Sequence, residues 1–375
     1  MTTRIWMTAV LVGMLVPMTA DAQLGAVASD KYQALKHPLP PSSGTWAILD
    51  RDGAGRKVEP YLSSLGGGEA GAGVIISPTF TMTVDKITFT ICGHDGQQGG
   101  RGQNYIALVD YATGKTLIKT MAPGNDAMQE RSWDVSKLSP RRARIEVHDG
   151  NTDGAFAWLG IGSIDAGPEL RIDFSKGLPE DWKVTGKLPS ERTESVMGGI
   201  PFSRFPAVYT MVPSTGAAEI PCGFTAEHLY FLGCTVHRGK PLEIYGSIEV
   251  VYRSGRTERY PLMFGFTLDG QDKLPSRSKA MHLHASGDRF QHYLVVRPAP
   301  EEIEKIRLAR NPEHDAIPRV TAITCETTAS AGSLLRLPSC NPKAEEQAWI
   351  GSHALSADYP KMEEIRAEIR RAYKK

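Results

Sequence analysis

Short runs of alternating apolar residues fill the stretch from Gly73 to Ala166, and they constrain the fold of this chain most strongly. The alternating positions are Phe80, Met82 and Val84, followed by Ile87, Phe89 and Ile91. Tyr105 to Asp110 and Ala143 to His148 are further β-prone runs, bounded by glycine, aspartate and asparagine. Because side chains alternate between the two faces of a strand, this period predicts strands with one buried face. We therefore expect a sandwich of short antiparallel strands.

A second β-rich region begins near Gly198. Its runs are apolar or alternate, and turn signals such as Ser254-Gly255-Arg256 and Ser286-Gly287-Asp288 separate them. Without a 22-residue signal segment the chain keeps 353 of its 375 residues, which is more than one hydrophobic core usually organises. The sequence therefore predicts a mainly β protein with two antiparallel β-sandwich domains, at residues 44–167 and 168–342.

The two ends of the chain have a different character. Residues 23–43 run into the sequence PLPPSSG, which favours an extended N-terminal arm over a packed element. In the tail, residues 343–375, apolar side chains recur at spacings of three and four: Met362, Ile365, Ile369, Ala372 and Tyr373. This period predicts an amphipathic C-terminal α-helix. Packing on the second sandwich, dimerisation and a membrane-surface role all fit such a helix.

Residues 1–22 have the three parts of a secretory signal peptide. These parts are a positive start at Arg4, an apolar core from Ala9 to Met18 and the cleavage pattern Ala20-Asp21-Ala22. The alternative is a membrane anchor, but Pro17 and Asp21 interrupt a run shorter than the roughly 20 apolar residues that span a bilayer. We expect a secreted or periplasmic bacterial protein that begins at Gln23 and has no membrane span.

The mature chain has an odd number of cysteines, which are Cys92, Cys222, Cys234, Cys325 and Cys340. An exported protein meets oxidising conditions, so disulfides are allowed and one thiol is left over. We expect Cys222 to pair with Cys234, across one strand, and Cys325 with Cys340, across one loop. These spacings contain no Cys-x-x-Cys pair, so they do not support a zinc ribbon.

Charge is nearly balanced, with 43 lysines and arginines against 42 aspartates and glutamates, and neither sign forms a long block. Phosphate binding needs a concentrated basic face, so the balance argues against a nucleic-acid partner and suits a neutral ligand such as a sugar. The glycine-rich stretch from Ser63 to Gly73 lacks the Gly-x-x-x-x-Gly-Lys-Ser/Thr order. It predicts a flexible loop and no phosphate cradle.

Several motifs between residues 73 and 166 share the order found in one family of sandwiches. They are Ser77-Pro78-Thr79-Phe80-Thr81, a Gly/His-rich loop after the next strand, Leu108-Val109-Asp110, Ser132-Trp133-Asp134-Val135-Ser136, Ala143-Arg144-Ile145-Glu146 and Trp158-Leu159-Gly160-Ile161-Gly162. This set resembles the galactose-binding-like (jelly-roll) β-sandwiches that accompany bacterial levanases and other secreted glycosidases. The resemblance covers about a quarter of the chain and includes no catalytic motif of those enzymes. It implies an exported protein with a carbohydrate ligand, by analogy of fold. The second region resembles other secreted carbohydrate-associated modules only loosely.

Asp149, Asn151 and Asp153, followed by Gly154, match the opening of a calcium-binding loop. Alternate oxygen ligands converge on one cation in such a loop, and the glycine permits its tight turn. Gly160 stands where an EF-hand has glutamate, and strands flank the loop, so an EF-hand is excluded. A structural calcium completed by backbone oxygens fits the pattern, as the resemblance also implies. A turn that needs no metal fits it too.

The loop from Gly93 to Asn104 is the most polar long loop of the first sandwich. Its donors and acceptors for sugar hydroxyls would be His94, Asp95, Arg101 and Asn104. Loops on a rigid scaffold commonly carry binding sites, and Trp158 could supply an apolar platform for a sugar ring. The apolar run around Trp158 also fits a core position for this residue.

His282, His284 and His292 form a second constellation, because a hairpin turning at residues 286–288 would bring three imidazoles together. Such a set could bind zinc, although a packed or solvated hairpin fits the sequence as well. Glycosidases need two carboxylates across the cleaved bond. Asp95 with Asp149, or Glu249 with Glu258, are candidate pairs, but no catalytic motif singles them out.

The sequence thus favours a secreted, non-catalytic carbohydrate-binding or accessory protein of polysaccharide processing. The alternative is a hydrolase or lyase acting on polysaccharide, with its site between the sandwiches or among the three histidines. A further alternative is a structural envelope protein that binds another protein through its sheet edges.

Overall fold

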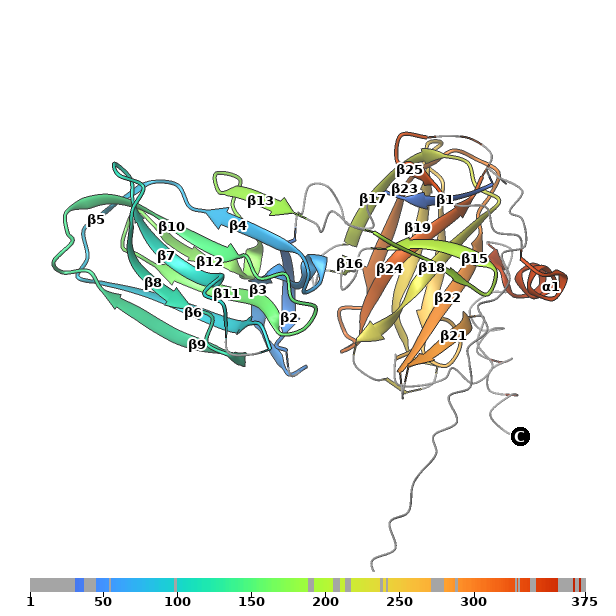
Figure 1. Ribbon diagram of the computed structural model, residues 1–375, viewed down its shortest axis with the longest axis horizontal. Helices are drawn as coiled ribbons and strands as arrows, with labels where there is room; N and C mark the ends of the chain where they lie inside the picture. Colours follow the sequence, from blue (N-terminus) through green and yellow to red (C-terminus); the bar gives the residue numbers. More distant parts are fainter. Residues whose placement is uncertain are drawn as a thin grey trace, which may run out of the picture.

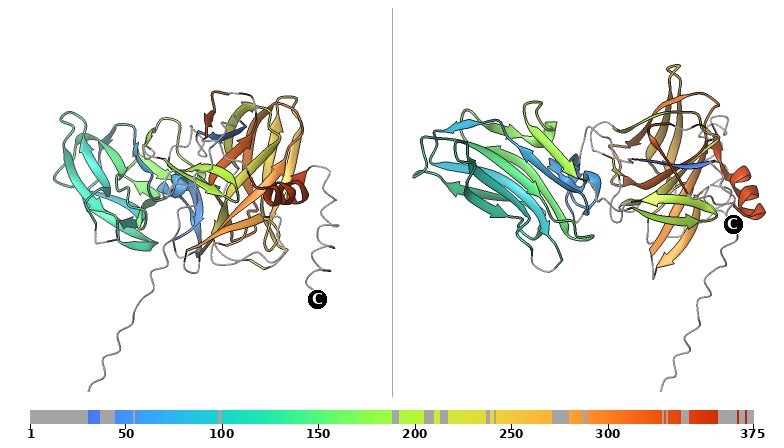
Figure 2. Two further views of the ribbon diagram at one scale, coloured as in Figure 1. Left: turned by 45° about the vertical axis from the view of Figure 1, so that its right-hand side comes forward. Right: turned by 45° about the horizontal axis from the view of Figure 1, so that its top comes forward.

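The chain is mainly β in the computed structural model shown in Figure 1, which confirms the predicted class. The structure describes residues 31–36, 45–53, 55–97, 100–187, 192–204, 210–212, 217–236, 239–240, 242–270, 280–286, 289–327, 329, 331–337, 342–356, 367 and 371. Its strands gather into two lobes, which the further views of Figure 2 also separate. We call residues 47–187 the first lobe, and residues 32–35 with 193–356 the second lobe.

Two antiparallel sheets form the first lobe. One sheet has the order β13 (Lys183–Lys187), β4 (Ala72–Ile76), β10 (Arg141–Asp149), β7 (Asn104–Asp110) and β8 (Thr116–Met121), with β5 (Phe80–Met82) also on β10. The other has the order β2 (Ala47–Arg51), β3 (Lys57–Ser63), β11 (Ala157–Asp165), β6 (Lys86–Asp95) and β9 (Asn125–Asp134), with β12 (Arg171–Asp173) on β11. Two short 3-10 turns, η1 (Ser64–Gly67) and η2 (Phe174–Lys176), accompany these strands.

The core of the first lobe lies between these two sheets. Ile145 and Val147 of β10 are buried while the residues between and beside them are partly exposed, and Ile87, Phe89 and Ile91 of β6 enter the same apolar cluster. Full burial of one such side chain stabilises the fold by about 1.5–3 kcal/mol. The period-2 pattern therefore forms the strands that the sequence predicts.

Two sheets also form most of the second lobe. The larger has the order β21 (Ala280–Ser286), β22 (Arg289–Arg297), β18 (His228–Val236), β24 (Ile317–Glu326), β1 (Tyr32–Leu35) and β25 (Leu334–Arg336), with β16 (Thr210–Met211) on β24 and β26 (Leu355–Ser356) on β22. The smaller has the order β17 (Ala217–Phe224), β23 (Ile303–Arg310), β19 (Ile244–Tyr252) and β20 (Thr257–Met263). A hairpin of β14 (Thr193–Met197) and β15 (Ile200–Arg204) completes it.

Apolar side chains cover both faces of the larger sheet. Its inner face shares a core with the smaller sheet, which includes Phe231 from β18 and Ile248 from β19. On its outer face, Tyr230 and Tyr293 pack against Phe202 of β15 and Ile350 of helix α1 (Ala344–His353). The hairpin and the helix therefore close the outer side of the second lobe, as Figure 1 shows.

Strand β1 differs from the extended arm expected for residues 23–43. All four of its residues, Tyr32–Leu35, are buried, and the strand pairs with β24 on one side and β25 on the other. Gln33 donates from its side chain to the backbone oxygens of Thr327 and Ala329, both at 3.1 Å. A run of four residues shows too little periodicity to predict a strand. Its pairing is also not predictable locally, because its partners lie about 290 residues further along the chain.

Some expectations for the two ends lie outside the described residues. These are the signal peptide at residues 1–22 and the amphipathic helix from residue 360 onward. Within the predicted tail, the structure places α1 at Ala344–His353 and the short strand β26 after it. In the described part of the chain, no helix has the length and apolar content needed to cross a bilayer.

The cysteine pairing predicted from the sequence is wrong. Cys222 and Cys325 are both free, so neither expected disulfide forms, and Cys340 lies outside the described residues. Cys222 on β17 and Cys325 on β24 instead pack in the same core between the two sheets of the second lobe. Burial raises the pKa of the Cys222 thiol to about 12, and it raises that of Cys325 well above its usual value. Both thiols are therefore unreactive core groups in this fold.

Candidate functional site

A pocket of about 350 Å³ opens where the two lobes meet. We call it the interlobe pocket. Its lining comes mostly from the first lobe, with Ile317 and Arg319 of β24 contributed by the second: Leu49, Arg51, Asp52, Gly53, Tyr61, Leu65, Glu69, Asp126, Ala155, Phe156, Trp158, Ile317 and Arg319. Its volume lies in the range of small-ligand sites. Figure 1 shows β2 and the end of β11 on the side of the first lobe that faces the second.

Two ion pairs and an apolar contact hold the lobes together beside this pocket. Arg310 of β23 binds Asp50 of β2 through two bonds, Nη1 to Oδ1 at 2.9 Å and Nη2 to Oδ2 at 3.2 Å. Arg51 forms an ion pair with Asp315. Ile317 packs against Leu49, Tyr61 and Trp158 of the first lobe, in one cluster. The floor of the pocket is therefore formed from both lobes at once.

One wall of the interlobe pocket is aromatic. Trp158 is nearly buried, whereas Phe156 exposes 48 % of its surface and has a φ of 56°. This left-handed backbone is rare for an aromatic residue, and it is held here by a 2.6 Å hydrogen bond from the Gly96 N–H to the Phe156 carbonyl. His94 packs edge-on against the Phe156 ring, with ring centroids 5.1 Å apart. Strained backbone of this kind clusters at ligand sites, and here it presents an aromatic ring to solvent.

Two carboxyl groups with different surroundings line the same pocket. Asp126 at the start of β9 accepts a hydrogen bond from His94 Nε2 at 3.0 Å. Glu69, which follows η1, has its pKa raised to about 7, first because burial disfavours the carboxylate and also because Asp126 lies nearby. Arg319 and the Phe156 backbone N–H act in the opposite direction. Glu69 therefore holds a proton at a pH where exposed glutamates have lost theirs.

A second, more polar pocket of about 360 Å³ adjoins the first one. We call it the rim pocket; it is lined by Asp95, Gly96, Gln97, Gly100, Arg101, Asp153, Gly154 and Ala155. Ala155 lines both pockets, so they are neighbours, and we refer to the two together as the groove. At the rim, Arg101 and Asp153 form an ion pair at 3.2 Å.

The structure brings together three of the five residues that the sequence predicts for ligand binding. His94 and Trp158 lie with ring centroids 6.1 Å apart at the interlobe pocket, and Arg101 lies at the rim. Asp95 also lines the rim pocket, but its carboxylate already accepts backbone N–H bonds from residues 102–104. Asn104 is fully buried and bonds backbone groups of His94, Gly150 and Asn151. Asp95 and Asn104 therefore shape the loops that carry the groove.

The three predicted calcium ligands, Asp149, Asn151 and Asp153, do not share one set of partners in the structure. Asn151 Oδ1 accepts the Asp153 N–H at 2.9 Å, and the Asp153 carboxylate pairs with Arg101. Asp149 is 1 % exposed, and its carboxylate forms no hydrogen bond within the described residues. Burial raises its pKa well above the usual value, against the opposing effect of the nearby Ser64 and Asn104 side chains. An unpartnered buried carboxylate fits a cation ligand, whereas the Asn151 and Asp153 oxygens would have to leave their partners. Calcium at this loop therefore stays a prediction.

The sequence did not single out Glu69, Asp126, Phe156, Arg51 or Arg319. Glu69 lies in the glycine-rich stretch that predicts a flexible loop, yet Ser64, Gly66 and Gly67 of η1 are buried there. Gly66 packs so closely on Thr45, Trp46 and Ala47 that an added Cβ would lie about 3 Å from them. The sequence signal that could have indicated Glu69 is a single acidic residue within a stretch of small residues. Nothing in the local pattern indicates Arg319, because β24 reaches the pocket only through the fold.

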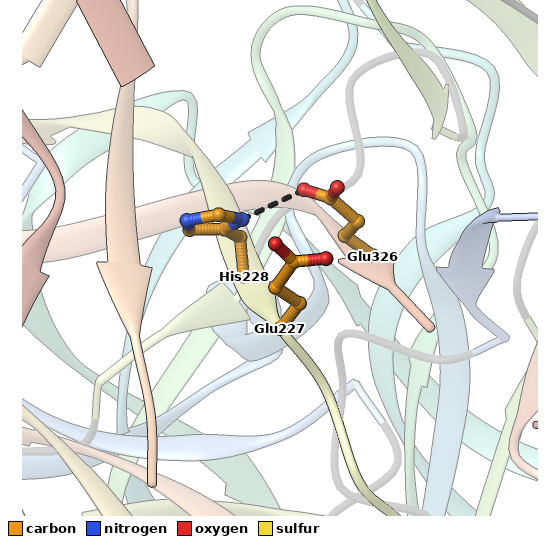
Figure 3. Close-up of side chains that lie close together, drawn as sticks. All are labelled: Glu227, His228 and Glu326. Carbon is orange, nitrogen blue, oxygen red and sulfur yellow. Dashed lines mark hydrogen bonds and ion pairs between the residues drawn. The ribbon is translucent and has the colours of Figure 1, made fainter. Parts of the chain in front are cut away.

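The second lobe holds a compact charged cluster of Glu227, His228 and Glu326, shown in Figure 3. His228 Nδ1 donates to Glu326 at 2.8 Å, because its Nε2 accepts from Arg297 Nε at 3.3 Å. The potential ligand atoms of Glu227, His228 and Glu326 lie within 4.8 Å of one another, a spacing that suits a metal ion. The Lys31 ammonium, however, forms ion pairs with both carboxylates. A cation from the chain itself therefore already neutralises this cluster.

Hydrogen bonds set the charge of Glu326 in that cluster. Burial opposes ionisation, but bonds from His228, Lys31 and Tyr230 lower the pKa of Glu326 to about 2. Because Lys31 immediately precedes β1, the cluster ties the N-terminal strand to β18 and β24. We interpret it as an anchor for that strand.

The histidine hairpin has the expected register on its backbone. β21 and β22 pair antiparallel with His282 opposite His292, and an irregularity follows before His284. The side chains of His282 and His284 lie outside the described residues, so the zinc hypothesis stays a prediction.

The fold and the site together define a mainly β protein with a groove of aromatic and acidic side chains between two lobes. No protein-family model matches the chain. Over 87 residues it is 33 % identical to the "Putative glycosyl hydrolase ecdE" of Aspergillus rugulosus. The matched stretch covers 23 % of this chain and 12 % of that protein. The match thus spans about an eighth of the length of that relative.

Solved structures resemble the whole chain only remotely. The "N-terminal CBM22-1-CBM22-2 tandem domain from Paenibacillus barcinonensis Xyn10C" has a TM-score of 0.18 and 13 % identity, covering 81 % of this chain and 100 % of that one. A structure of "infectious bursal disease virus Gt strain" has a TM-score of 0.17 and 11 % identity, covering 84 % of this chain and 75 % of that one. Superpositions at these scores carry no conclusion about fold or function.

Proposed function

We propose that this protein is an exported carbohydrate-binding protein of polysaccharide processing, and that the groove formed by the interlobe and rim pockets holds the glycan. The observation that carries this proposal is Phe156. Its ring is half exposed, it lies beside Ala155, which lines both pockets, and its backbone is held in an unfavourable conformation. An aromatic face of this kind suits the apolar face of a sugar ring.

The polar lining supports a neutral ligand rich in hydroxyl groups. Among the residues described in the groove, five side chains are acidic and three are arginines: Asp52, Glu69, Asp126, Asp95 and Asp153 against Arg51, Arg319 and Arg101. Carboxylates accept hydroxyl hydrogens and guanidinium groups donate to hydroxyl oxygens, so this mixture suits sugar hydroxyls. An excess of carboxylates disfavours phosphate or another polyanion.

The resemblance of residues 73–166 to galactose-binding-like sandwiches supports the same ligand class, and we propose that fold family for the first lobe. The name of the fungal relative, which matches over a short stretch, points in the same direction. Export is proposed from residues 1–22, and the structural calcium from the loop at Asp149.

Retention of the full chain on a panel of insoluble polysaccharides tests this function. We expect retention on at least one neutral polysaccharide, and we expect Phe156→Ala to weaken it roughly tenfold, because an aromatic contact is worth about 0.5–1.5 kcal/mol. Tyr111→Ala is the matched control, since Tyr111 is 49 % exposed in the same lobe but lines neither pocket. Equal thermal stability of both variants excludes unfolding as the cause.

Two outcomes would count against the proposal. If no polysaccharide retains the protein, the protein-binding alternative replaces carbohydrate binding. If the Phe156 and Tyr111 variants bind as tightly as the original chain, a glycan binds elsewhere and the groove is not its site.

A further inference from the structure

Glu69 and Asp126 are acidic side chains from separate elements that line the interlobe pocket. Glu69 lies in the segment after η1, and Asp126 lies at the start of strand β9. Both side chains line the pocket, and no hydrogen bond joins the two carboxyls among the bonds of the described residues. Hydrolysis of a glycoside needs one carboxylic acid and one carboxylate on either side of the bond.

The surroundings of these two groups divide the roles between them. Burial keeps Glu69 protonated up to a pH of about 7, as a proton donor requires. Asp126 has 37 % of its side chain exposed and accepts a hydrogen bond from His94. In a pair of carboxyl groups that differ in this way, the more buried one is suited to be the acid and the more exposed one to be the base.

The backbone keeps space open around Asp126. A Cβ added at Gly53 would lie 2.3 Å from Asp126 Oδ1 and 2.9 Å from the Trp158 ring. Any larger residue at position 53 would therefore push against both the carboxylate and the aromatic wall. His94 contacts Asp126, Phe156 and Trp158 at once, so we regard it as the residue that positions the carboxylate.

We propose that the interlobe pocket hydrolyses a glycosidic bond, with Glu69 as proton donor and Asp126 as the base that activates water. The bond between the anomeric carbon and the leaving oxygen breaks, and Glu69 gives its proton to that oxygen. A water molecule forms the new bond to the anomeric carbon and gives a proton to Asp126. Solvent then returns a proton from Asp126 to Glu69, so one water is consumed in each cycle. This proposal rests on the proposed carbohydrate binding, and it goes beyond binding.

Release of reducing ends from the polysaccharide that retains the protein tests the proposal. We expect the full chain to release them and Glu69→Gln to lower the rate at least a hundredfold, since general acid catalysis contributes about 10²–10⁴. This variant should still be retained on the polysaccharide, because Phe156 and the rest of the groove are intact and the amide keeps the shape of the side chain. Glu59→Gln is the matched control: Glu59 is an exposed glutamate on neighbouring β3 and lines neither pocket.

The pH profile separates a catalytic role of Glu69 from a structural one. The charged groups that act on Glu69 are Asp126 and Arg319, and Arg51 and Asp52 line the same pocket. We expect kcat/KM to fall above a pH of about 7, where Glu69 loses its proton. Any residual activity of Glu69→Gln should lack this basic limb.

The other outcomes of the retention and release assays distinguish failure of hydrolysis from failure of carbohydrate binding. Retention without release by the original chain overturns hydrolysis and leaves carbohydrate binding intact. Release that survives Glu69→Gln overturns the role of Glu69. Absence of both retention and release contradicts the proposed function itself.

Discussion

Three acidic residues of this protein differ in which neighbouring groups stabilise or oppose the negative charge of the carboxylate. Glu326 is buried and Glu69 is partly buried, yet hydrogen bonds lower the pKa of Glu326 to about 2 and burial raises that of Glu69 to about 7. Asp149 has neither a hydrogen bond nor an ion pair among the described residues. The same side-chain chemistry therefore gives an anchor, a carboxyl group that keeps its proton up to about pH 7 and an unpaired buried acid.

Asp149→Asn tests whether the unpaired carboxylate serves a cation. The pKa of Asp149 is raised in the folded state, so its contribution to stability is fully present below about pH 4, the unfolded value, and is lost as pH rises. Without calcium, the asparagine variant should be more stable at pH 7 by roughly 1–3 kcal/mol, the cost of burying an unsatisfied polar group. Thermal unfolding in chelator and in calcium chloride measures this.

Calcium should reverse that order if it binds at this loop. It should raise the melting temperature of the original chain and leave Asp149→Asn unchanged. Asp85→Asn, at an exposed aspartate of the same lobe, is the control and should respond to calcium as the original does. A melting temperature that ignores calcium in every variant would rule out the predicted site.

At the scale of elements, the short strand β1 is the least expected part of the fold. It lies between β24 and β25, and Lys31 beside it pairs with Glu326 at the end of β24. Four residues form this strand, so its position depends on these neighbours more than on its own propensity. Its anchor should therefore be sensitive to acid.

The Glu326 cluster should stabilise the second lobe above about pH 4.3 and lose its effect as pH falls toward 2. The pKa of Glu326 is lowered in the folded state, so the carboxylate contributes above its unfolded pKa and not below its folded one. Because Lys31 is partly exposed, we expect an effect on the order of 2 kcal/mol. Urea unfolding at pH 7, 4 and 2.5 measures the free energy.

In Glu326→Gln the free energy of unfolding should be lower at pH 7 and should depend less on pH in this range. Glu304→Gln, at an exposed glutamate of β23, is the control. If the glutamine variant loses stability on acidification as steeply as the original chain, the cluster is not the acid-sensitive anchor.

At the scale of the whole molecule, the chain visits the second lobe twice. It forms β1 there, builds the first lobe, and returns to complete the second. Buried Arg310 and partly buried Asp50 then join the lobes directly, next to the pocket. The geometry of the proposed groove therefore depends on the contact between the lobes.

Asp50→Ala should loosen this contact. Removal of one partner leaves the buried Arg310 charge without its carboxylate, which typically costs 3–5 kcal/mol. We expect the melting temperature to fall, the calorimetric transition to separate into two, and polysaccharide retention to weaken. Arg253→Ala, which breaks an exposed pair with Glu302, should cost less than about 1 kcal/mol. Equal effects of the two substitutions would contradict a coupling between the lobes.

Much of the fold was predictable because strands are encoded locally. Alternation in β6 and β10 marks which side chains face the core, and this period predicted both β-rich regions. The polar glycine-rich loop and the nearby tryptophan predicted His94, Arg101 and Trp158 as ligand contacts; the structure places them at or beside the two pockets, and binding by them stays a prediction. The free Cys222 and Cys325 show the limit, since spacing along the chain says little about distance between sheets.

The sequence by itself determined the β class and the positions of most strands, because side-chain alternation within one strand needs no distant partner. Only the tertiary structure decided that β1 enters the second lobe, that Glu69 and Asp126 share a pocket, and that Arg319 lies beside them. Residues 69 and 319 are separated by most of the chain, and no local pattern records a contact between them. Burial in that contact also sets the protonation of Glu69, so the chemistry of the proposed site arises only when both lobes are in place.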